Sequence, residues 1–185
     1  LHGTGLLPVT RVLGALGLQL HVVKQQQQPD GRFPTVTAPN PENPDAFRLA
    51  IALAEETGAN LLLATDPDCD RLGVAVRDAA GGFKLLTGNQ IGCLLLEYLL
   101  SRGALPEDAF VVRSIVSSPL ADRIAAQYGV EMRQVLTGFK YIAEQIRLSQ
   151  ESGQGHFLFG FEESYGFLAG DFVRDKDACI AAMLV

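Results

Sequence analysis

Helix-like and strand-like segments alternate along almost the whole chain, and this alternation constrains the fold more than any other feature of the sequence. Apolar residues recur at the i, i+3, i+4, i+7 spacing of a one-sided helix in six segments, which start at residues 9, 47, 91, 121, 139 and 178. Short apolar runs between them predict strands at residues 19–23, 61–65, 72–76, 110–115, 131–136 and 156–161. Such alternation is typical of the α/β class.

Three local features refine this prediction. The stretch DAAGG at residues 78–82 predicts a hairpin turn that leads into a further strand, so the sheets should be mixed rather than purely parallel. The last helix should start after Asp175, whose side chain can cap the first backbone N–H groups. The best domain boundary lies at residues 86–88 and gives two units, 1–86 and 87–185, each large enough to fold around its own core.

Composition excludes several classes of function. Of the 185 residues 48% are apolar, and the formal net charge is −6 without a basic block, so we expect neither nucleic-acid nor membrane binding. No apolar run is long enough to span a bilayer. Cys69, Cys93 and Cys179 have no CxxC spacing and predict reduced thiols in a cytoplasmic protein. The chain starts at Leu1 and stops within a helical pattern, so we expect a fragment of a longer protein.

Three aspartates follow a predicted strand in the stretch LLLATDPDCDRLGVAV. Asp66, Asp68 and Asp70 repel one another, and at i, i+2, i+4 on an extended segment they share one face and can converge on one cation. Oxygen ligands suit Mg²⁺, Mn²⁺ or Ca²⁺. An EF-hand is excluded because Arg71 and Arg77 stand where its loop needs glycine and glutamate. The alternative is a solvated acidic turn, which the preceding LLLA disfavours. Arg71 can pair with the aspartates or face a phosphate.

Two basic loops open predicted helices. In TGFK the backbone N–H groups of Thr137 and Gly138 favour an anion, and Lys140 adds positive charge. The alternative there is an ordinary N-cap beside a surface lysine. In RDKDA, Lys176 lies at the start of the last helix, where capping and a local ion pair are the alternative explanation.

A third polar loop, GFEESYG, places Glu162, Glu163 and Ser164 between glycines. Carboxylates in such a loop commonly accept hydroxyl groups of a sugar or ribose, and a simple polar turn is the alternative. Polar loops follow four of the predicted strands, and ligands of open α/β sheets bind at the carboxyl ends of strands. The four loops together therefore indicate a binding site.

The motifs TDPDCDRLGVAV, TGFK, GFEESYG and RDKDA, in this order, resemble those of the α-D-phosphohexomutase superfamily, in particular its phosphoglucomutase and phosphomannomutase members. The resemblance covers essentially the whole chain. It implies two similar small three-layer α/β domains with mixed sheets, the second and third of the family's four domains. Residues 1–86 would form the domain with the metal-binding loop, and residues 87–185 the domain with the sugar-binding loop, truncated at its C-terminus.

The resemblance also implies roles for individual residues. Carried over by position, three aspartates would bind Mg²⁺, and four residues would bind the substrate. Of three catalytic cations, Arg71 would lie beside the phosphoserine and the two lysines would line the cleft. The metal ligands are Asp66, Asp68 and Asp70, the catalytic groups Arg71, Lys140 and Lys176, and the substrate-binding residues Glu162, Ser164, Thr137 and Gly138. Glu162 and Ser164 would hold the sugar hydroxyls.

The activity implied is phosphoryl transfer between hexose 1-phosphate and hexose 6-phosphate. A phosphoserine would donate the phosphoryl group, and glucose 1,6-bisphosphate would be the intermediate and activator. Neither a TASHNP-like serine loop nor an RxSGTEP-like phosphate loop occurs in the sequence, and Ser117 and Ser118 do not match the context of the nucleophile. We therefore expect that these residues need the flanking domains of the same chain and are inactive alone.

Several alternatives stay open at this point. The substrate can be mannose phosphate instead of glucose phosphate, although GFEESYG is more similar to glucose-preferring branches. A non-catalytic module that binds metal and sugar phosphate is a second alternative. A haloacid-dehalogenase-type phosphatase is disfavoured because Asp70 stands where its motif has Thr or Val. A nucleotide-sugar glycosyltransferase is disfavoured because no uridine-nucleotide site is evident.

Overall fold

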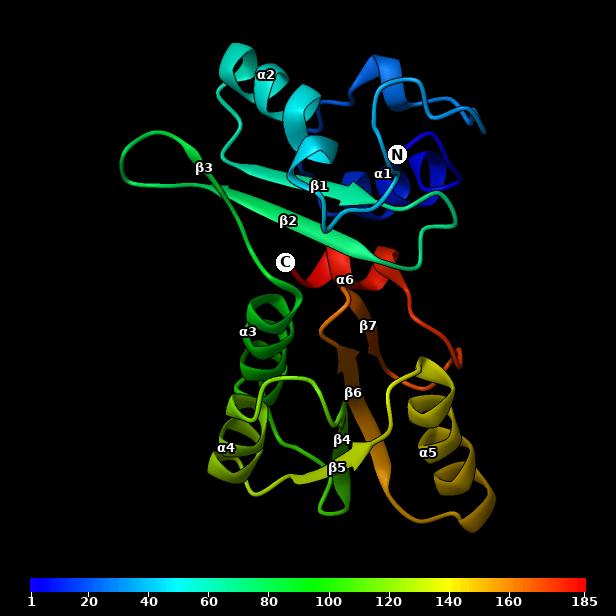
Figure 1. Ribbon diagram of the computed structural model, residues 1–185. Helices are drawn as coiled ribbons and strands as arrows, with labels where there is room; N and C mark the ends of the chain where they lie inside the picture. The colour runs from blue at the N-terminus through cyan, green and yellow to red at the C-terminus, as the bar shows by residue number, and fades with distance from the viewer.

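Two sheets organise the chain in the computed structural model, which describes residues 1–185 (Figure 1). The first sheet has the strand order β1-β2-β3, and all its pairs are antiparallel. A turn closes the β2–β3 hairpin, because Asp78 Oδ1 accepts hydrogen bonds from the Ala80 and Gly82 amides. The elements of this half are α1 (Leu6–Ala15), η1 (Lys24–Gln26), η2 (Pro44–Phe47), α2 (Arg48–Thr57), β1 (Leu61–Thr65), β2 (Leu72–Arg77) and β3 (Phe83–Leu85).

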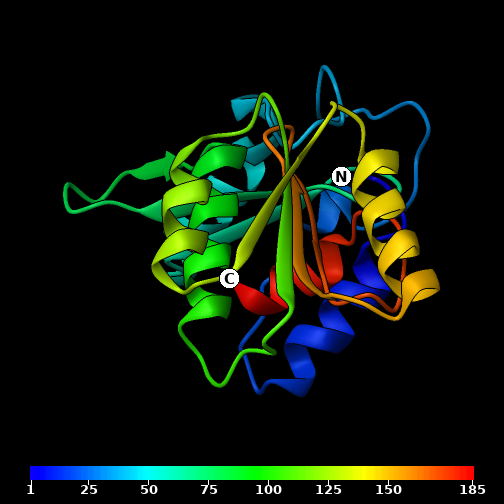
Figure 2. The same cartoon turned by 90° about the horizontal axis from the view of Figure 1, so that it is seen from below.

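The second sheet is mixed, in the order β5-β4-β6-β7. Strand β4 is parallel to β5 and β6, and β7 is antiparallel to β6. Helices α3 and α4 cover one face of this sheet and α5 covers the other (Figure 2). The elements are α3 (Gly88–Leu100), β4 (Ala109–Ser114), α4 (Leu120–Gln127), β5 (Glu131–Val135), α5 (Phe139–Ser152), β6 (His156–Glu162), β7 (Gly166–Ala169) and α6 (Ala178–Leu184). The predicted α/β class with mixed sheets is thus confirmed.

Alternating side chains of β4 explain why helices cover both faces. Phe110 and Val112 point to the α5 side and pack with Ile142 and Ile146, whereas Val111 joins the cluster on the α3 side. Because every second residue of a strand faces the same way, a strand whose apolar residues Phe110, Val111 and Val112 follow one another needs cover on both faces. All six residues of β4 are buried.

Helix α6 joins the two halves of the molecule. It lies between the first sheet and β7 (Figure 1) and packs on β7, α1 and β2. Its Ala178 and Ala181 belong to one buried cluster with Leu13 of α1 and Leu72 of β2. The aspartate-bearing loop between β1 and β2 is therefore held close to the second sheet. No helix in the fold has the length and apolar character needed to cross a membrane.

The predicted N-cap of α6 is wrong. Asp177, not Asp175, caps this helix, because its Oδ1 accepts hydrogen bonds from the amides of Cys179 (2.7 Å) and Ile180 (3.2 Å). Asp175 lies two residues too early to reach these amides and instead accepts a hydrogen bond from Lys176 Nζ (3.0 Å).

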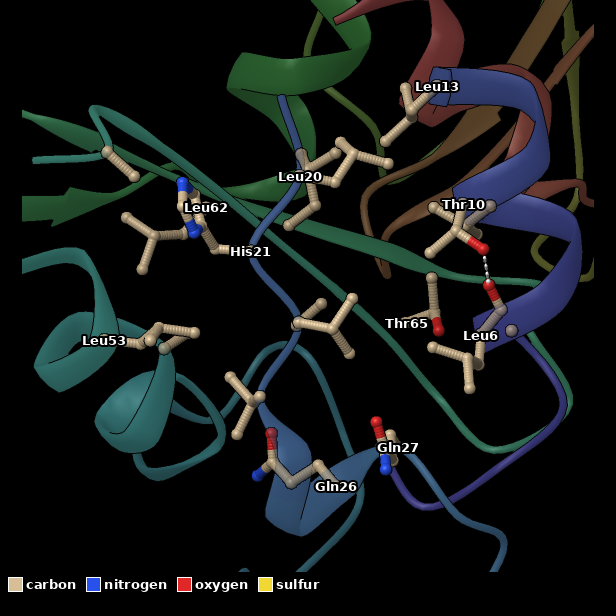
Figure 3. Close-up of a pocket in the computed structure, with 18 of the residues that line it drawn as sticks. Leu6, Thr10, Leu13, Leu20, His21, Gln26, Gln27, Leu53, Leu62 and Thr65 are labelled. Atoms are coloured by element: carbon tan, nitrogen blue, oxygen red, sulfur yellow. Dashed lines mark hydrogen bonds between the residues drawn. The ribbon is translucent and has the colours of Figure 1, made fainter. Parts of the chain in front are cut away.

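The strand predicted at residues 19–23 is also wrong. Leu20 and His21 of this segment line a cavity of about 250 Å³ together with Leu62 and Thr65 of β1 (Figure 3). The segment forms no hydrogen-bonded ladder with β1, so the first sheet has no parallel strand. Conversely, β7 is absent from the predicted strands, because its four residues are all buried and show no alternation of apolar and polar side chains.

Candidate functional site

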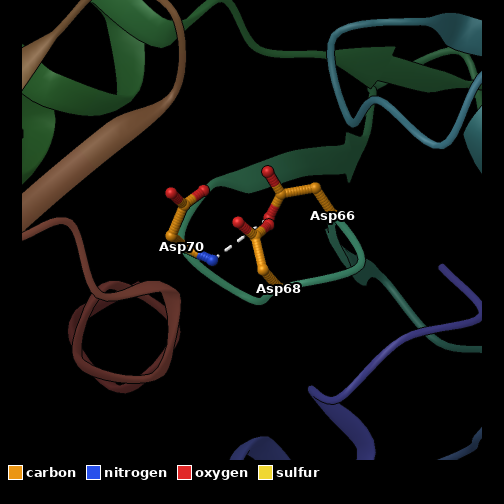
Figure 4. A group of neighbouring side chains, drawn as sticks. All are labelled: Asp66, Asp68 and Asp70. Carbon is orange, nitrogen blue, oxygen red and sulfur yellow. Dashed lines mark hydrogen bonds between the residues drawn. The ribbon is translucent and has the colours of Figure 1, made fainter. Parts of the chain in front are cut away.

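The loop between β1 and β2 brings Asp66, Asp68 and Asp70 together (Figure 4). One oxygen of each carboxylate lies within 4.8 Å of the others. The loop, residues 66–71 and hereafter the aspartate loop, folds around Asp66, which is only 2% exposed. Asp66 Oδ1 accepts hydrogen bonds from the backbone N–H groups of Asp70 (3.1 Å) and Arg71 (3.0 Å). Cys69 adopts a left-handed conformation (φ 63°) that closes the turn.

Two cations pair with two of the three carboxylates of the aspartate loop. Arg71 Nε lies 2.7 Å from Asp66 Oδ2, and Lys176 Nζ lies 2.9 Å from Asp70 Oδ2. Burial acts to raise the pKa of Asp66, but hydrogen bonds from the Arg71 backbone and side chain and from Asp70 outweigh it and hold this pKa below its ordinary value. Burial raises the pKa of Asp70 despite the hydrogen bond with Lys176.

The donor set of this loop fits a hard divalent cation. All three side chains offer carboxylate oxygens, which suit Mg²⁺ or Ca²⁺, and neither a thiol nor an imidazole is part of the cluster. Asp68 is exposed and forms no hydrogen bond within the protein, so both its oxygens remain free to bind. Arg71, which the sequence left between two roles, pairs here with Asp66, and its Nη1 lies 3.6 Å from Glu42.

The turn between β6 and β7 forms the second part of the site. Glu162 pairs with Gly166 across the hairpin, so residues 163–165 form the β6–β7 turn. Tyr165 has a φ of 69°, a left-handed conformation that reverses the chain direction. Glu162 is buried, and its Oε1 accepts a hydrogen bond of 2.6 Å from the Gly138 amide. Ser164 is partly exposed at the tip and forms no side-chain hydrogen bond.

The TGFK loop is brought to Glu162 by its Gly138 amide, whereas the side chains of Thr137 and Lys140 are exposed and bond to none of the other predicted site residues. Thr137 is exposed, and the Lys140 ammonium lies 5.0 Å from the centre of the Tyr141 ring without an acidic partner. The Gly138 amide, predicted to hold a ligand anion, donates to Glu162 instead. A helix N-terminus stabilises negative charge, so the start of α5 fixes the carboxylate of Glu162.

Backbone contacts connect the aspartate loop to the β6–β7 turn. The amide of Leu72 donates to Tyr165 O (3.1 Å), and Arg71 forms an isolated antiparallel bridge with Gly166. A side chain at Gly166 would lie 2.5 Å from Lys176 Cδ, so glycine here makes room for the lysine that reaches Asp70. Favourable hydrogen bonds with Asp70 and Asp175 overcome the effect of burial and raise the pKa of Lys176.

The sequence did not predict the residues at the end of β4 and before α3 that hold the β6–β7 turn. Ser114 and Ser117 donate hydrogen bonds to Glu163, and Tyr165 donates its hydroxyl to Leu86 O. The only available sign was the polar SSP stretch after β4, which indicates a loop but not its partner. The structure therefore divides the predicted site residues into three groups. One cluster contains the aspartate loop and its cations, namely Asp66, Asp68, Asp70, Arg71 and Lys176. An adjoining cluster contains Glu162, Gly138 and Ser164, and the side chains of Thr137 and Lys140 lie on the exposed surface.

Comparisons with known proteins agree with this arrangement. Residues 1–82 match the family model described as phosphoglucomutase/phosphomannomutase, alpha/beta/alpha domain II, and residues 87–185 match alpha/beta/alpha domain III. The chain is 46% identical over 179 residues to a phosphoglucomutase of Staphylococcus aureus (strain USA300) and 48% identical over 180 residues to one of Staphylococcus epidermidis (strain ATCC 12228). Each alignment covers 96% of this chain but only 32% of the relative.

A solved structure of similar fold is that of a phosphoglucomutase/phosphomannomutase family protein from Burkholderia thailandensis. Its TM-score is 0.75 at 24% sequence identity, and the match covers 98% of this chain and 36% of that one. The likeness supports the fold. In both comparisons the chain spans about a third of the length of its relatives.

Proposed function

The chain belongs to the phosphoglucomutase/phosphomannomutase family, and from this premise we propose that the whole protein interconverts hexose 1-phosphate and hexose 6-phosphate by phosphoryl transfer. The observation that carries the proposal is the direct contact between an acidic loop suited to a divalent cation and a turn with hydroxyl-binding groups. A sugar phosphate needs both kinds of group within one site.

Asp66, Asp68 and Asp70 are the proposed metal ligands. Mg²⁺ bound there would supply charge neutralisation for the phosphoryl group in transfer. Arg71 and Lys176 already lie against these carboxylates, so they keep the loop in shape and add positive charge beside the site. We assign Lys140 to the same site because it is an unpaired cation in the first turn of α5, two residues from the Gly138 amide that binds Glu162.

Glu162 and Ser164 are the proposed sugar ligands, with Thr137 and Gly138 beside them. Glu162 Oε1 accepts the hydrogen bond from the Gly138 amide. Its Oε2 is therefore free to accept a hydrogen bond from a hydroxyl group of the substrate. The Ser164 hydroxyl can donate or accept. Such paired groups suit a hexose that must be held in two orientations while each end is phosphorylated in turn.

The organisation of the whole protein is part of the proposal. Residues 1–86 would be its second domain and residues 87–185 most of its third, and the phosphoserine would come from a flanking domain. Glucose 1,6-bisphosphate would be the intermediate, and the cytoplasm the place of action. Because the nucleophile lies elsewhere, residues 1–185 alone would be inactive. The curated relatives are phosphoglucomutases, which favours glucose over mannose as the preferred sugar.

Steady-state kinetics of the whole protein test this function. We expect Mg²⁺-dependent conversion of glucose 1-phosphate to glucose 6-phosphate, a lower kcat/KM with mannose 1-phosphate, and loss of activity in excess EDTA that added Mg²⁺ restores. The polypeptide of residues 1–185, assayed in parallel, should show no turnover. Absence of turnover by the whole protein with both sugars would favour the non-catalytic binding module instead.

A further inference from the structure

The β6–β7 turn is anchored by a side chain other than its two proposed sugar ligands. Glu163 Oε2 accepts hydrogen bonds from Ser114 Oγ (2.9 Å) and Ser117 Oγ (3.2 Å) at the carboxyl end of β4. Both serines are buried, and their two hydroxyl oxygens lie 2.7 Å apart. Without the carboxylate, the serines could bond only to each other, and one hydroxyl proton would lose its acceptor.

The surface that receives Glu163 is itself fixed by a buried cation. Arg113 is 4% exposed, and its Nη1 donates to Ser114 O (3.0 Å) and Ser117 O (3.1 Å). Its Nε and Nη2 both donate to Asp122 at 2.7 Å. Asp122 of helix α4 therefore fixes the orientation of the Arg113 side chain. Arg113 in turn fixes the backbone carbonyls of Ser114 and Ser117. Glu163 docks on groups that are already in place rather than ordering a free loop.

The backbone of the turn is confined on another side by α3. A Cβ atom at Gly88 would lie 2.0 Å from Glu163 O and 2.9 Å from the Tyr165 nitrogen. Together with the hydrogen bond from the Tyr165 hydroxyl to Leu86 O (3.1 Å), this packing keeps the backbone of the turn from moving closer to α3. Glu162 and Ser164 are the chain neighbours of Glu163, so the hydrogen bonds of the Glu163 side chain help to fix the backbone from which both sugar ligands project.

We propose that Glu163 is a positioning residue of the site, which holds Glu162 and Ser164 at the sugar by binding the hydroxyls of Ser114 and Ser117. The inference rests on the proposed function of Glu162 and Ser164, and it extends that function to a residue that does not touch the substrate. Removal of a group that orients a metal ligand typically lowers affinity or activity by about 10- to 100-fold, and we expect an effect of the same order for residues that orient sugar ligands. Loss of the Glu163 side chain should therefore lower the affinity for the hexose phosphate and raise KM more than it lowers kcat.

Variants of the whole protein can test this role. Glu163→Ala should raise KM for glucose 1-phosphate by about 10-fold or more. Glu163→Gln should recover part of this loss, because its amide oxygen can accept the same two hydroxyl protons. Ser114→Ala combined with Ser117→Ala should raise KM similarly, and adding Glu163→Ala to this pair should change little further.

Glu97→Ala is the matched control. Glu97 also accepts a hydrogen bond from a hydroxyl, that of Tyr128 (2.5 Å), between α3 and the end of α4. Its loss should lower the melting temperature without changing KM. The proposal is overturned if Glu163→Ala lowers the melting temperature in the same way and leaves KM unchanged.

Hydrogen exchange separates this proposal from the proposed function. If the wild-type protein shows no mutase activity, the function fails, but the positioning role can still be decided. Amides of residues 162–166 should exchange faster in Glu163→Ala than in wild type and in Glu97→Ala. Equal protection of these amides in all three proteins would overturn the positioning role.

Discussion

The aspartate loop and the β6–β7 turn lie side by side but are built in opposite ways. Asp66 receives its hydrogen bonds from residues four and five positions further along the chain. The turn is held across separations of 24 residues (Gly138 to Glu162), 46 to 49 residues (Ser117 and Ser114 to Glu163) and 79 residues (Leu86 to Tyr165). The hydrogen bonds around the Asp66 side chain are thus local in sequence, although Thr4, Lys176 and Ala178 contact other residues of the loop from a distance. The turn, in contrast, depends throughout on the completed fold.

This difference implies different weaknesses. The arrangement around Asp66 fails when Asp66 or Arg71 changes, because the distant contacts of the loop reach Pro67, Cys69 and Asp70 instead of the Asp66 carboxylate. A turn held from several directions fails gradually, because each anchor contributes part of its position. Variants in the two regions should therefore differ both in the size of the effect and in whether binding or folding is affected.

The largest effects should come from the aspartate loop. Asp68→Asn and Asp66→Asn in the whole protein should each lower kcat by about 100-fold or more, because each removes a proposed metal ligand. Only Asp66→Asn should also lower the free energy of unfolding, by roughly 2–3 kcal/mol, because the buried Asp66 carboxylate is the partner of Arg71. Kinetics, Mg²⁺ titration calorimetry and urea unfolding measure these effects. Equal unfolding energies for the two variants would show that the loop does not fold around Asp66.

The next effect concerns Glu162 in the second half of the site. Glu162→Gln should lower kcat/KM by about 10- to 100-fold, the range expected for one lost charged hydrogen bond with the sugar. The amide oxygen of the glutamine can still accept the Gly138 amide, so the melting temperature should change little. Kinetics and thermal melting measure both quantities. A large loss of stability would mean that Glu162 serves mainly to cap α5, and the proposed sugar contact would lose its support.

The same contrast explains what the sequence could predict. The spacing of Asp66, Asp68 and Asp70 is visible in the sequence, and the structure brings the three carboxylates together. Most strands and all six helices were predictable because their apolar periods are local. The partners of Glu163 were not, since nothing in EESYG indicates that Ser114 and Ser117 lie behind it. The strand at residues 19–23 fails for the same reason, because a strand needs a neighbour that its own sequence does not specify.

A smaller effect tests how firmly the turn depends on α3. Gly88→Ala should lower the free energy of unfolding by about 1–3 kcal/mol, since the new Cβ would overlap Glu163 O and the backbone must shift. Gly14→Ala in α1 is the matched control, because a Cβ there meets nothing within 4 Å and alanine favours helix by about 1 kcal/mol. Urea unfolding of both variants gives the comparison. If Gly88→Ala is as harmless as Gly14→Ala, the turn has room to move on α3.

The smallest effect tests whether the aspartate loop is as independent as its local hydrogen bonds indicate. Cys69 of this loop lies with its sulfur 3.8 Å from that of Cys179 in α6, and burial raises the pKa of Cys179 from 9.0 to about 12. Between these two values the unfolded chain binds fewer protons at this thiol than the folded protein, so stability falls as pH rises through this window and is unaffected below it. Cys179→Ser should flatten this part of the pH dependence of unfolding, and thiolate ultraviolet absorbance should show the late ionisation directly. The contrary outcome is an unchanged pH dependence of unfolding in Cys179→Ser, together with ionisation of the thiol near pH 9. It would mean that α6 does not bury the loop. The two halves of the site would then be held together by the Lys176–Asp70 ion pair and the Leu72–Tyr165 hydrogen bond.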